Sequence, residues 1–104
     1  MTRTRSLRIT DQAEDDLAGI WAFIAADNPQ AASAFVHKLR ERFEPLLSHP
    51  ELGPARDHLA SGLRVHFFRD YAFYYRYTDT EVIIIRVLHG ARDAHALMAS
   101  EYDD

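Results

Sequence analysis

Cysteine is absent from this 104-residue sequence, so no disulfide framework can form and no thiolate can ligate a metal. Long apolar runs are absent too, because the longest one, Val82–Ile85, is far shorter than a membrane span. The arginines near the start are followed by alternating apolar and polar residues rather than by an apolar stretch, which disfavours a signal peptide. We therefore expect a cytoplasmic protein that does not associate with a membrane.

Low-complexity segments and internal repeats are also missing, and glycine and proline occur only four times each. Hydrophobic residues make up 47% of the chain and charged residues 27%, which is typical of globular rather than disordered or coiled-coil proteins. A chain of this length can bury enough surface for one hydrophobic core. We expect residues 1–104 to form a single domain.

Lysine is nearly absent, since Lys38 is the one basic residue that is not an arginine. The formal net charge is −4 at pH 7. Affinity for nucleic acid comes largely from basic side chains that neutralise phosphates, so an acidic chain is a poor candidate for general nucleic-acid binding. The charge is unevenly placed: residues 11–27 are strongly acidic, whereas residues 62–92 carry a net positive charge.

Catalytic and metal-binding motifs are missing as well. None of the six histidines has a second histidine four residues away, so we expect no metal site and no cofactor. The four glycines form no phosphate-binding loop, and no serine or threonine lies in a nucleophile motif. The acidic pair Asp15 and Asp16 is interpreted as complementing the positive end of a helix, not as a catalytic dyad.

The first half of the chain predicts a helical hairpin. Apolar residues recur at helical spacing through residues 13–24. Asn28 and Pro29 then end this helix and begin a second one, because asparagine is a good N-cap and proline fits the first helical position. The second apolar stripe runs through residues 32–43, and Pro45 should kink or end that helix.

Four segments have the pattern of strands. Residues 7–10 alternate apolar and polar side chains, and three further runs follow the polar loop His49–Gly62. These runs are Leu63–Phe67, Tyr71–Tyr77 and Val82–His89. The order β-α-α-β-β-β predicts an α+β fold, in which the hairpin packs on one face of an antiparallel sheet and a short C-terminal helix can be added. The last run is apolar almost throughout, as expected of a central strand.

Basic residues gather in the second half of the chain, at the ends of two predicted strands. The candidates for contacting a target or for building a site are Arg64, Arg86, His89 and Arg92. Arg86 is the basic side chain best placed to bridge the two strands. The alternative interpretation is that the arginines pair with nearby acids and fix loops in place. The acids considered are Asp57, Asp70 and Asp93.

Several motifs, taken in order, resemble one protein family. They are Ala13-x-x-Asp16-Leu17-x-x-Ile20-Trp21-x-x-Ile24, Asn28-Pro29-x-Ala31-Ala32, Pro50-x-x-Gly53, Gly62-Leu63-Arg64 and the run Arg86–Asp93. This combination resembles the ParE toxins of the RelE/ParE superfamily, which act in type II toxin–antitoxin systems. The resemblance implies a compact α+β toxin that poisons DNA gyrase. It also implies a cognate antitoxin, a small DNA-binding protein whose tail is disordered when free.

The other branch of this superfamily comprises ribosome-dependent mRNA interferases of the RelE type. Cutting RNA requires a base, an acid and cations around the phosphorane. The loop before the second strand offers only Arg56 and His58, and Tyr102 lies among acidic residues. We therefore expect a gyrase inhibitor with no catalytic residues rather than a nuclease. A toxin that has lost its activity and only binds its antitoxin is a third interpretation.

The predicted fold leaves one face of the sheet without a helical cover. Apolar side chains on that face need shelter, which a partner can supply. The residues expected to bind the antitoxin are Tyr74, Arg76, Val82 and Ile84. An antitoxin tail could fold onto this face as a strand or as a helix. The alternative is that residues 93–103 of the chain itself fold back and cover it.

Overall fold

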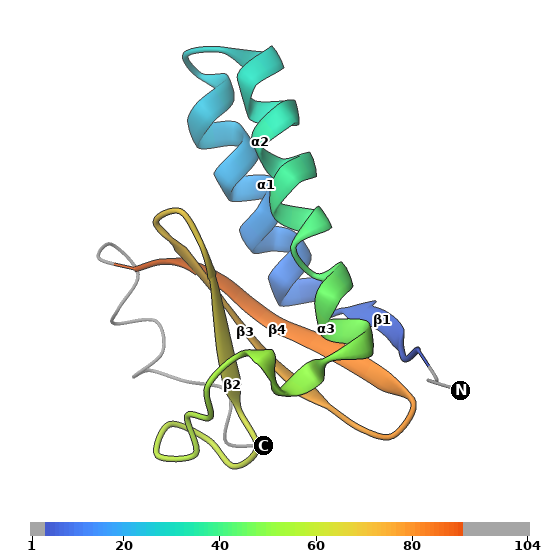
Figure 1. Ribbon diagram of the computed structural model, residues 1–104. Coiled ribbons are helices and arrows are strands. Elements are labelled where there is room, and N and C mark those ends of the chain that lie inside the picture. Colours follow the sequence, from blue (N-terminus) through green and yellow to red (C-terminus); the bar gives the residue numbers. More distant parts are fainter. Residues whose placement is uncertain (1–3, 91–104) are drawn as a thin grey trace.

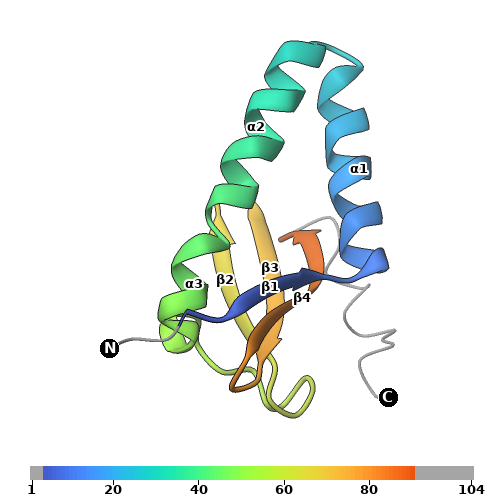
Figure 2. The ribbon, with the colours of Figure 1, turned by 90° about the vertical axis from the view of Figure 1, so that its right-hand side faces the viewer.

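The computed structural model describes residues 4–90 (Figure 1). Its elements are β1 (Ser6–Ile9), α1 (Asp11–Ala25), α2 (Pro29–Glu41), α3 (Glu44–Ser48), the 3-10 helix η1 (Pro50–Leu52), β2 (Arg64–Phe68), β3 (Tyr71–Tyr77) and β4 (Glu81–His89). The α1–α2 hairpin packs on the sheet at its base and extends well beyond it at its tip (Figures 1 and 2). The expected C-terminal helix lies outside the described residues. In residues 4–90 no helix is both long enough and apolar enough to span a membrane.

The helix boundaries follow from the capping residues. Thr10 caps α1, since its hydroxyl oxygen accepts a hydrogen bond from the backbone N–H of Ala13 at 3.1 Å. Asn28 caps α2 by accepting from the N–H of Ala31 at 3.0 Å, with Pro29 at the first helical position. The chain turns after α2 and resumes as α3, which has Pro45 in its first turn. The predicted hairpin and its end before Pro45 are thus confirmed.

The sheet has the strand order β1-β4-β3-β2. The pairs β2–β3 and β3–β4 are antiparallel, as predicted for strands joined by short turns. β1, however, pairs with β4 in parallel, so the sheet is mixed and the expectation of an antiparallel sheet was wrong in this detail. The reason is that the whole helical region separates β1 from the rest of the sheet, and no tight turn fixes its direction. The α+β class and the central position of β4 are confirmed.

A β-bulge interrupts the pairing of β3 with β4. Tyr74 lies opposite Arg86 and Tyr75 lies opposite Ile84, so Ile85 is an extra residue in β4. The hydroxyl of Thr10 donates to the carbonyl oxygen of Ile85 at 3.0 Å. The residue that caps α1 therefore also fixes the bulge, and this joins the start of the hairpin to the centre of the sheet.

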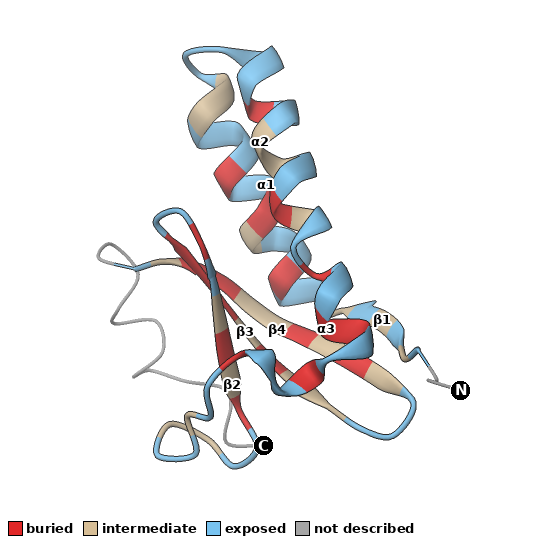
Figure 3. Cartoon of the chain, viewed as in Figure 1, coloured by how far each residue is buried: buried red, intermediate tan, exposed pale blue. Residues whose placement is uncertain are grey.

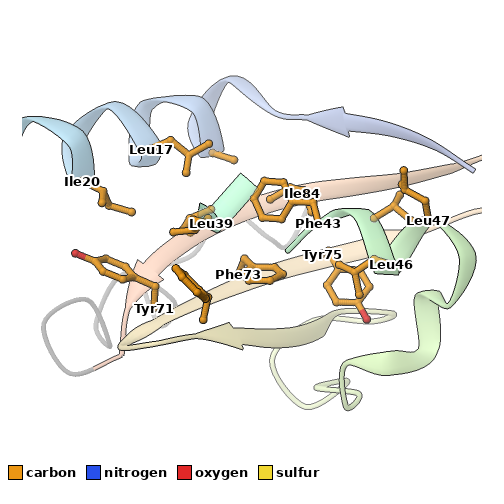
Figure 4. Close-up of a cluster of buried hydrophobic side chains, with 14 residues drawn as sticks. Leu17, Ile20, Leu39, Phe43, Leu46, Leu47, Tyr71, Phe73, Tyr75 and Ile84 are labelled. Carbon is orange, nitrogen blue, oxygen red and sulfur yellow. The ribbon is translucent and has the colours of Figure 1, made fainter. Parts of the chain in front are cut away.

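The core lies between the helices and one face of the sheet (Figures 3 and 4). Phe43, at the start of α3, packs edge-on against Phe73 of β3, with ring centroids 4.9 Å apart. Phe35 of α2 contacts Phe68 and Tyr71 near the other end of the sheet. These aromatic pairs join the second helix and the turn after it to β2 and β3, and they hold the hairpin over the sheet.

Candidate functional site

Arg86 is bound by an acidic residue of α1. Its Nε donates to Oδ2 of Asp16 at 2.8 Å and its Nη2 donates to Oδ1 at 3.0 Å. The backbone N–H of Val87 donates to the same Oδ2 at 2.9 Å. Both charged side chains are only 14% exposed. Arg86 was predicted to contact a target or to build the site, and its bidentate pair with Asp16 joins β4 to α1.

The position of Asp16 follows from the length of β1. β1 ends at Ile9, which lies opposite Ile84, so β1 does not extend as far as Val87. The carboxylate of Asp16 accepts the hydrogen bond from the N–H of Val87, which a longer β1 would otherwise have accepted through a backbone carbonyl. The position of Asp16 near the start of α1 predicted a charge that complements the helix end, and this role was not predicted. A signal was present, because Asp16 lies three residues after Ala13 and four before Ile20, at the border of the buried stripe.

Arg64 holds the loop that precedes it. Its Nη1 donates to the carbonyl oxygen of Gly53 at 2.7 Å. The hydroxyl of Tyr75 donates to the carbonyl oxygen of Pro50 at 2.6 Å and accepts from the N–H of Gly53 at 2.9 Å. Burial raises the pKa of Tyr75, and the hydrogen bond from Gly53 and the charge of Arg64 oppose this rise. The motifs at Pro50–Gly53 and Gly62–Arg64 therefore meet in one structural contact.

A surface hollow of about 320 Å³ lies beside this contact. Its lining residues are Ala55, Asp57, Gly62, Leu63, Arg64 and Tyr77. The ring of Tyr77 lies near two guanidinium groups, that of Arg5 at 5.2 Å from the ring centroid and that of Arg64 at 5.8 Å. Asp57 accepts a hydrogen bond from the N–H of Gly62 at 2.8 Å, so this carboxylate shapes the turn and does not pair with Arg64.

Arg64 and His89, two of the basic candidates, lie apart along the sheet. Arg64 lies opposite Tyr75, whereas His89 lies opposite Tyr71, four residues away along β3. At the rise of a strand this separation is about 13 Å. Arg92 lies outside the described residues. Their separation follows from the meander, because β2 and β4 have the same direction, with Arg64 at the start of β2 and His89 at the end of β4.

The residues predicted to bind the antitoxin divide between two environments. Val82 and Ile84 have no exposed area and belong to the helix-facing core. They were expected on the free face of the sheet, and this expectation was wrong. The register of β3 with β4 places Ile83, which points to the other face from Val82 and Ile84, opposite Arg76. Tyr74 and Arg76 are half-buried. Arg76 donates to the carbonyl oxygen of Ser61 at 3.0 Å, so the loop before β2 reaches this face.

Acidic and histidine side chains do not gather into a metal-ligand set. In the described part of the chain, no group of three or more His, Asp or Glu residues could hold a metal ion. The ion pairs found there join single acids to single bases. Apart from Asp16–Arg86, they are Arg8–Glu81, His37–Glu41 and Arg40–Glu14. These three pairs are exposed and contribute little to stability.

His66 of β2 is half-buried beside an aromatic ring. Its ring packs edge-on against Phe73, with centroids 5.4 Å apart. Burial lowers the pKa of His66 below its usual 6.5, and the nearby charge of Arg42 lowers it further. The folded protein therefore holds this imidazole in its neutral form more firmly than the unfolded chain does.

This shift predicts a loss of stability in mild acid. Below about pH 6.5 the unfolded chain takes up a proton at His66 more readily than the folded chain, so unfolding becomes more favourable as the pH falls. The free energy of unfolding should therefore decrease more between about pH 7.5 and pH 5.5 in the wild type than in His66→Gln. Urea unfolding at both pH values measures the difference. Equal decreases in the two proteins would contradict the assignment.

Residues 7–94 match the protein family described as ParE toxin of type II toxin–antitoxin system, parDE. The chain is 27% identical to Toxin ParE3 of Caulobacter vibrioides over 93 residues, which cover 88% of this chain and 93% of the relative.

Two solved structures are similar over most of their length. The chromosomal ParDE toxin–antitoxin system of P. aeruginosa matches with a TM-score of 0.71 and 24% identity, over 83% of this chain and 96% of that one. The RelBE2 toxin–antitoxin complex of Mycobacterium tuberculosis matches with a TM-score of 0.58 and 28% identity, over 86% and 94%. The first of these similarities speaks to the fold alone.

Proposed function

The chain belongs to the ParE toxin family of type II toxin–antitoxin systems, and from this membership we propose that it inhibits growth by poisoning DNA gyrase and is neutralised by direct binding of a cognate antitoxin. The family match extends over residues 7–94 and so includes all helices and strands of the fold except Ser6, the first residue of β1. Since gyrase is a cytoplasmic enzyme, this toxin would act in the cytoplasm.

The observation that best supports a binding mechanism is the engagement of the basic residues by the chain itself. Arg86 is held by Asp16, and Arg64 is held by the carbonyl oxygen of Gly53. His89 lies about 13 Å along the sheet from the register position of Arg64. RNA cleavage requires an acid, a base and cations that converge on one phosphate. The described residues offer no such convergence, which favours gyrase inhibition over the RelE-type nuclease activity.

The antitoxin is proposed from the solved relatives, which are a ParDE toxin–antitoxin system and a RelBE2 toxin–antitoxin complex. On this chain we place part of its contact on the sheet face that carries Tyr74 and Arg76. Burial raises the pKa of Tyr74, and the charge of Arg56 opposes the rise, so a basic side chain lies near this half-buried ring. The neighbouring Ile83 adds apolar surface to the same face.

We expect that expression of the chain without its antitoxin arrests growth and induces a DNA-damage response, while cellular mRNA stays intact. The physical reason is that a gyrase poison leaves broken DNA, whereas an interferase leaves cut transcripts. A damage-responsive reporter and mapping of mRNA 5′ ends in the same culture measure the two outcomes. Co-expression with the product of the neighbouring gene is the control and should restore growth.

Codon-specific cleavage of ribosome-bound mRNA by the purified chain would move the protein to the RelE branch. Growth without arrest and without either lesion would instead favour a toxin that has lost its activity.

A further inference from the structure

Most arginines of the described range are held by polar groups of the chain itself. Each of seven donates a side-chain hydrogen bond to a carboxylate or to a backbone carbonyl oxygen. They are Arg5, Arg8, Arg40, Arg56, Arg64, Arg76 and Arg86. Arg42 and Arg69 differ, because within residues 4–90 neither guanidinium forms an ion pair or a hydrogen bond. The fold therefore leaves the charge of these two side chains without a partner among the described residues.

The guanidinium groups of Arg42 and Arg69 lie over the same aromatic ring. Arg42, at the C-terminal end of α2, lies 4.9 Å from the ring centroid of Phe68, and Arg69 lies at 5.5 Å. Since both distances are measured to one centroid, the two groups are no more than about 10 Å apart. Both arginines are exposed, whereas Phe68 is buried. The ring thus supports two neighbouring cations at the surface.

The backbone of Arg69 has a conformation that arginine rarely adopts. Phe68 pairs with Tyr71, so Arg69 and Asp70 form a two-residue turn between β2 and β3 (Figure 1). Arg69 has a φ of 57°, and glycine or asparagine is the usual residue with a positive φ in such a turn. Backbone strain of this kind costs stability and clusters at functional sites. The turn itself does not call for arginine, which points to a role for the side chain.

The surroundings of the two arginines are also basic. Burial lowers the pKa of His66, and the charge of Arg42 lowers it further. His89, one of the residues predicted to contact a target, pairs with Tyr71, which in turn pairs with Phe68. Its ring packs edge-on against that of Tyr71, with centroids 5.3 Å apart. One basic candidate from the sequence therefore lies at the same end of the sheet as the two arginines.

We propose that Arg42 and Arg69 together bind phosphate groups of the DNA that gyrase holds when the toxin acts on it. This inference rests on the proposed function and adds to it a contact with the DNA itself. A guanidinium presents a planar fork of N–H donors that matches the oxygens of a phosphate. Each strand of DNA carries one negative charge per about 3.4 Å of helix axis, so two cations this close fit one phosphate or two neighbouring ones.

A pair of arginines suits DNA that another protein already holds. The formal net charge of the chain is −4, so DNA repels the chain as a whole. Two phosphate contacts are too few to hold free DNA at physiological salt. Gyrase presents its DNA in a fixed position, and a weak contact then adds to the stability of the whole complex. We therefore expect a DNA contact within the toxin–gyrase–DNA complex and no general nucleic-acid binding.

The potency of the toxin on gyrase tests this contact. Cleaved plasmid DNA is measured at increasing toxin concentration, after the gyrase reaction is stopped with denaturant. At about 50 mM salt, the variant Arg42→Gln, Arg69→Gly should need at least tenfold more toxin than the wild type for half-maximal trapping. This ratio should fall about tenfold by roughly 200 mM salt, because each lost phosphate contact lowers the salt slope by about 0.9. The variant Lys38→Gln, Arg40→Gln removes the same charge from α2 and should act as the wild type does.

Thermal stability separates a DNA contact from a structural role for Arg69. Glycine adopts a positive φ without strain, so Arg69→Gly should melt at the temperature of the wild type or above it while trapping less cleaved DNA. Arg69→Lys keeps the charge and should retain more potency than Arg69→Gly. A lower melting temperature together with weaker trapping in Arg69→Gly would show that the residue holds the turn, and the proposal would fail.

Crosslinking identifies the molecule that the arginines face. The chain has no cysteine, so Asp70→Cys introduces a single thiol beside Arg69, which a benzophenone maleimide can label. Ultraviolet light should join this position to labelled DNA in the toxin–gyrase–DNA complex. Ala26→Cys, exposed at the other end of α1 in the hairpin tip, carries the same label and should not reach the DNA.

The outcomes separate the DNA contact from the proposed function. Crosslinks from position 70 to the gyrase subunits alone overturn the proposal and assign the arginines to an acidic surface of the enzyme. Equal potency of Arg42→Gln, Arg69→Gly and the wild type at about 50 mM salt also overturns it. The proposed function depends on the wild-type chain: if that chain traps no cleaved DNA, gyrase poisoning itself is contradicted, and this inference with it.

Discussion

Replacement of Asp16 by alanine is expected to lower the free energy of unfolding by about 3 kcal/mol, although Asp16 lies on a helix that is mostly exposed. The carboxylate accepts three hydrogen bonds, two from Arg86 and one from the N–H of Val87. Both partners of the ion pair are 14% exposed, so alanine would leave a mostly buried guanidinium without its counter-ion. For a domain of this size the loss corresponds to a fall in the thermal midpoint of about 12 to 24 °C.

The neighbouring acid provides a matched control for this substitution. Asp15→Ala removes the same charge from the same turn of α1, but Asp15 is exposed, so the change should stay within about 0.5 kcal/mol. Asp16→Asn, which keeps an acceptor for the N–H of Val87, should lose less than Asp16→Ala. Combining Asp16→Ala with Arg86→Met should recover part of the loss, because the methionine brings no buried charge. Equal stabilities of Asp15→Ala and Asp16→Ala would show that the pair contributes nothing.

Gly53→Ala is the second substitution with a large expected effect, a loss of about 3 kcal/mol. A Cβ atom at this position would overlap the backbone carbonyl oxygen of Val65 and lie 2.8 Å from the hydroxyl oxygen of Tyr75. The first atom belongs to the backbone of β2 and the second is held by Pro50, so neither can move aside at low cost. The added methyl group would therefore break the contact that Tyr75 and Arg64 make with this loop.

Gly19→Ala tests whether the effect is specific to position 53. Gly19 lies in the middle of α1, and a Cβ atom there would meet nothing within 4 Å. Since alanine is the better helix former, Gly19→Ala should stabilise the protein by about 0.5 to 1 kcal/mol. Urea unfolding of the two variants measures both changes, with the m-value as a check on the unfolded state. Stabilisation by both substitutions would show that the loop at Gly53 is free to move.

The helical hairpin could be predicted from the sequence because its determinants are local. Thr10 and Asn28 cap helices through hydrogen bonds to residues three positions later, and Pro29 acts at a helix start wherever it follows such a cap. The run Tyr71–Tyr77 was predicted with the bounds that the structure shows, since its alternation and its turns are also local. β1 and β2 are shifted by one residue from the predicted runs, and β4 begins one residue earlier but ends at His89 as predicted.

Features that depend on distant parts of the chain were not predictable in the same way. Nothing near β1 indicates that it pairs with β4, and nothing in the apolar run of β4 marks Ile85 as the bulged residue. Val82 and Ile84 lie opposite Tyr77 and Tyr75, and this pairing, which the apolar run alone does not indicate, places them on the helix-facing side rather than in the environment to which they were assigned. The partner of Arg86 was missed for a related reason, since Asp16 is 70 residues away in sequence.

The parallel pairing of β1 with β4 has a consequence for how the protein folds during synthesis. Ser6 lies opposite Glu81, so the partner of the first strand is made 75 residues later. At the pace of translation this delay is roughly 4 to 15 s. The α1–α2 hairpin, built from contacts between near neighbours, can form in that interval, whereas closing so long a loop is a late and slow step. A nascent toxin therefore stays incomplete until nearly the whole chain has left the ribosome.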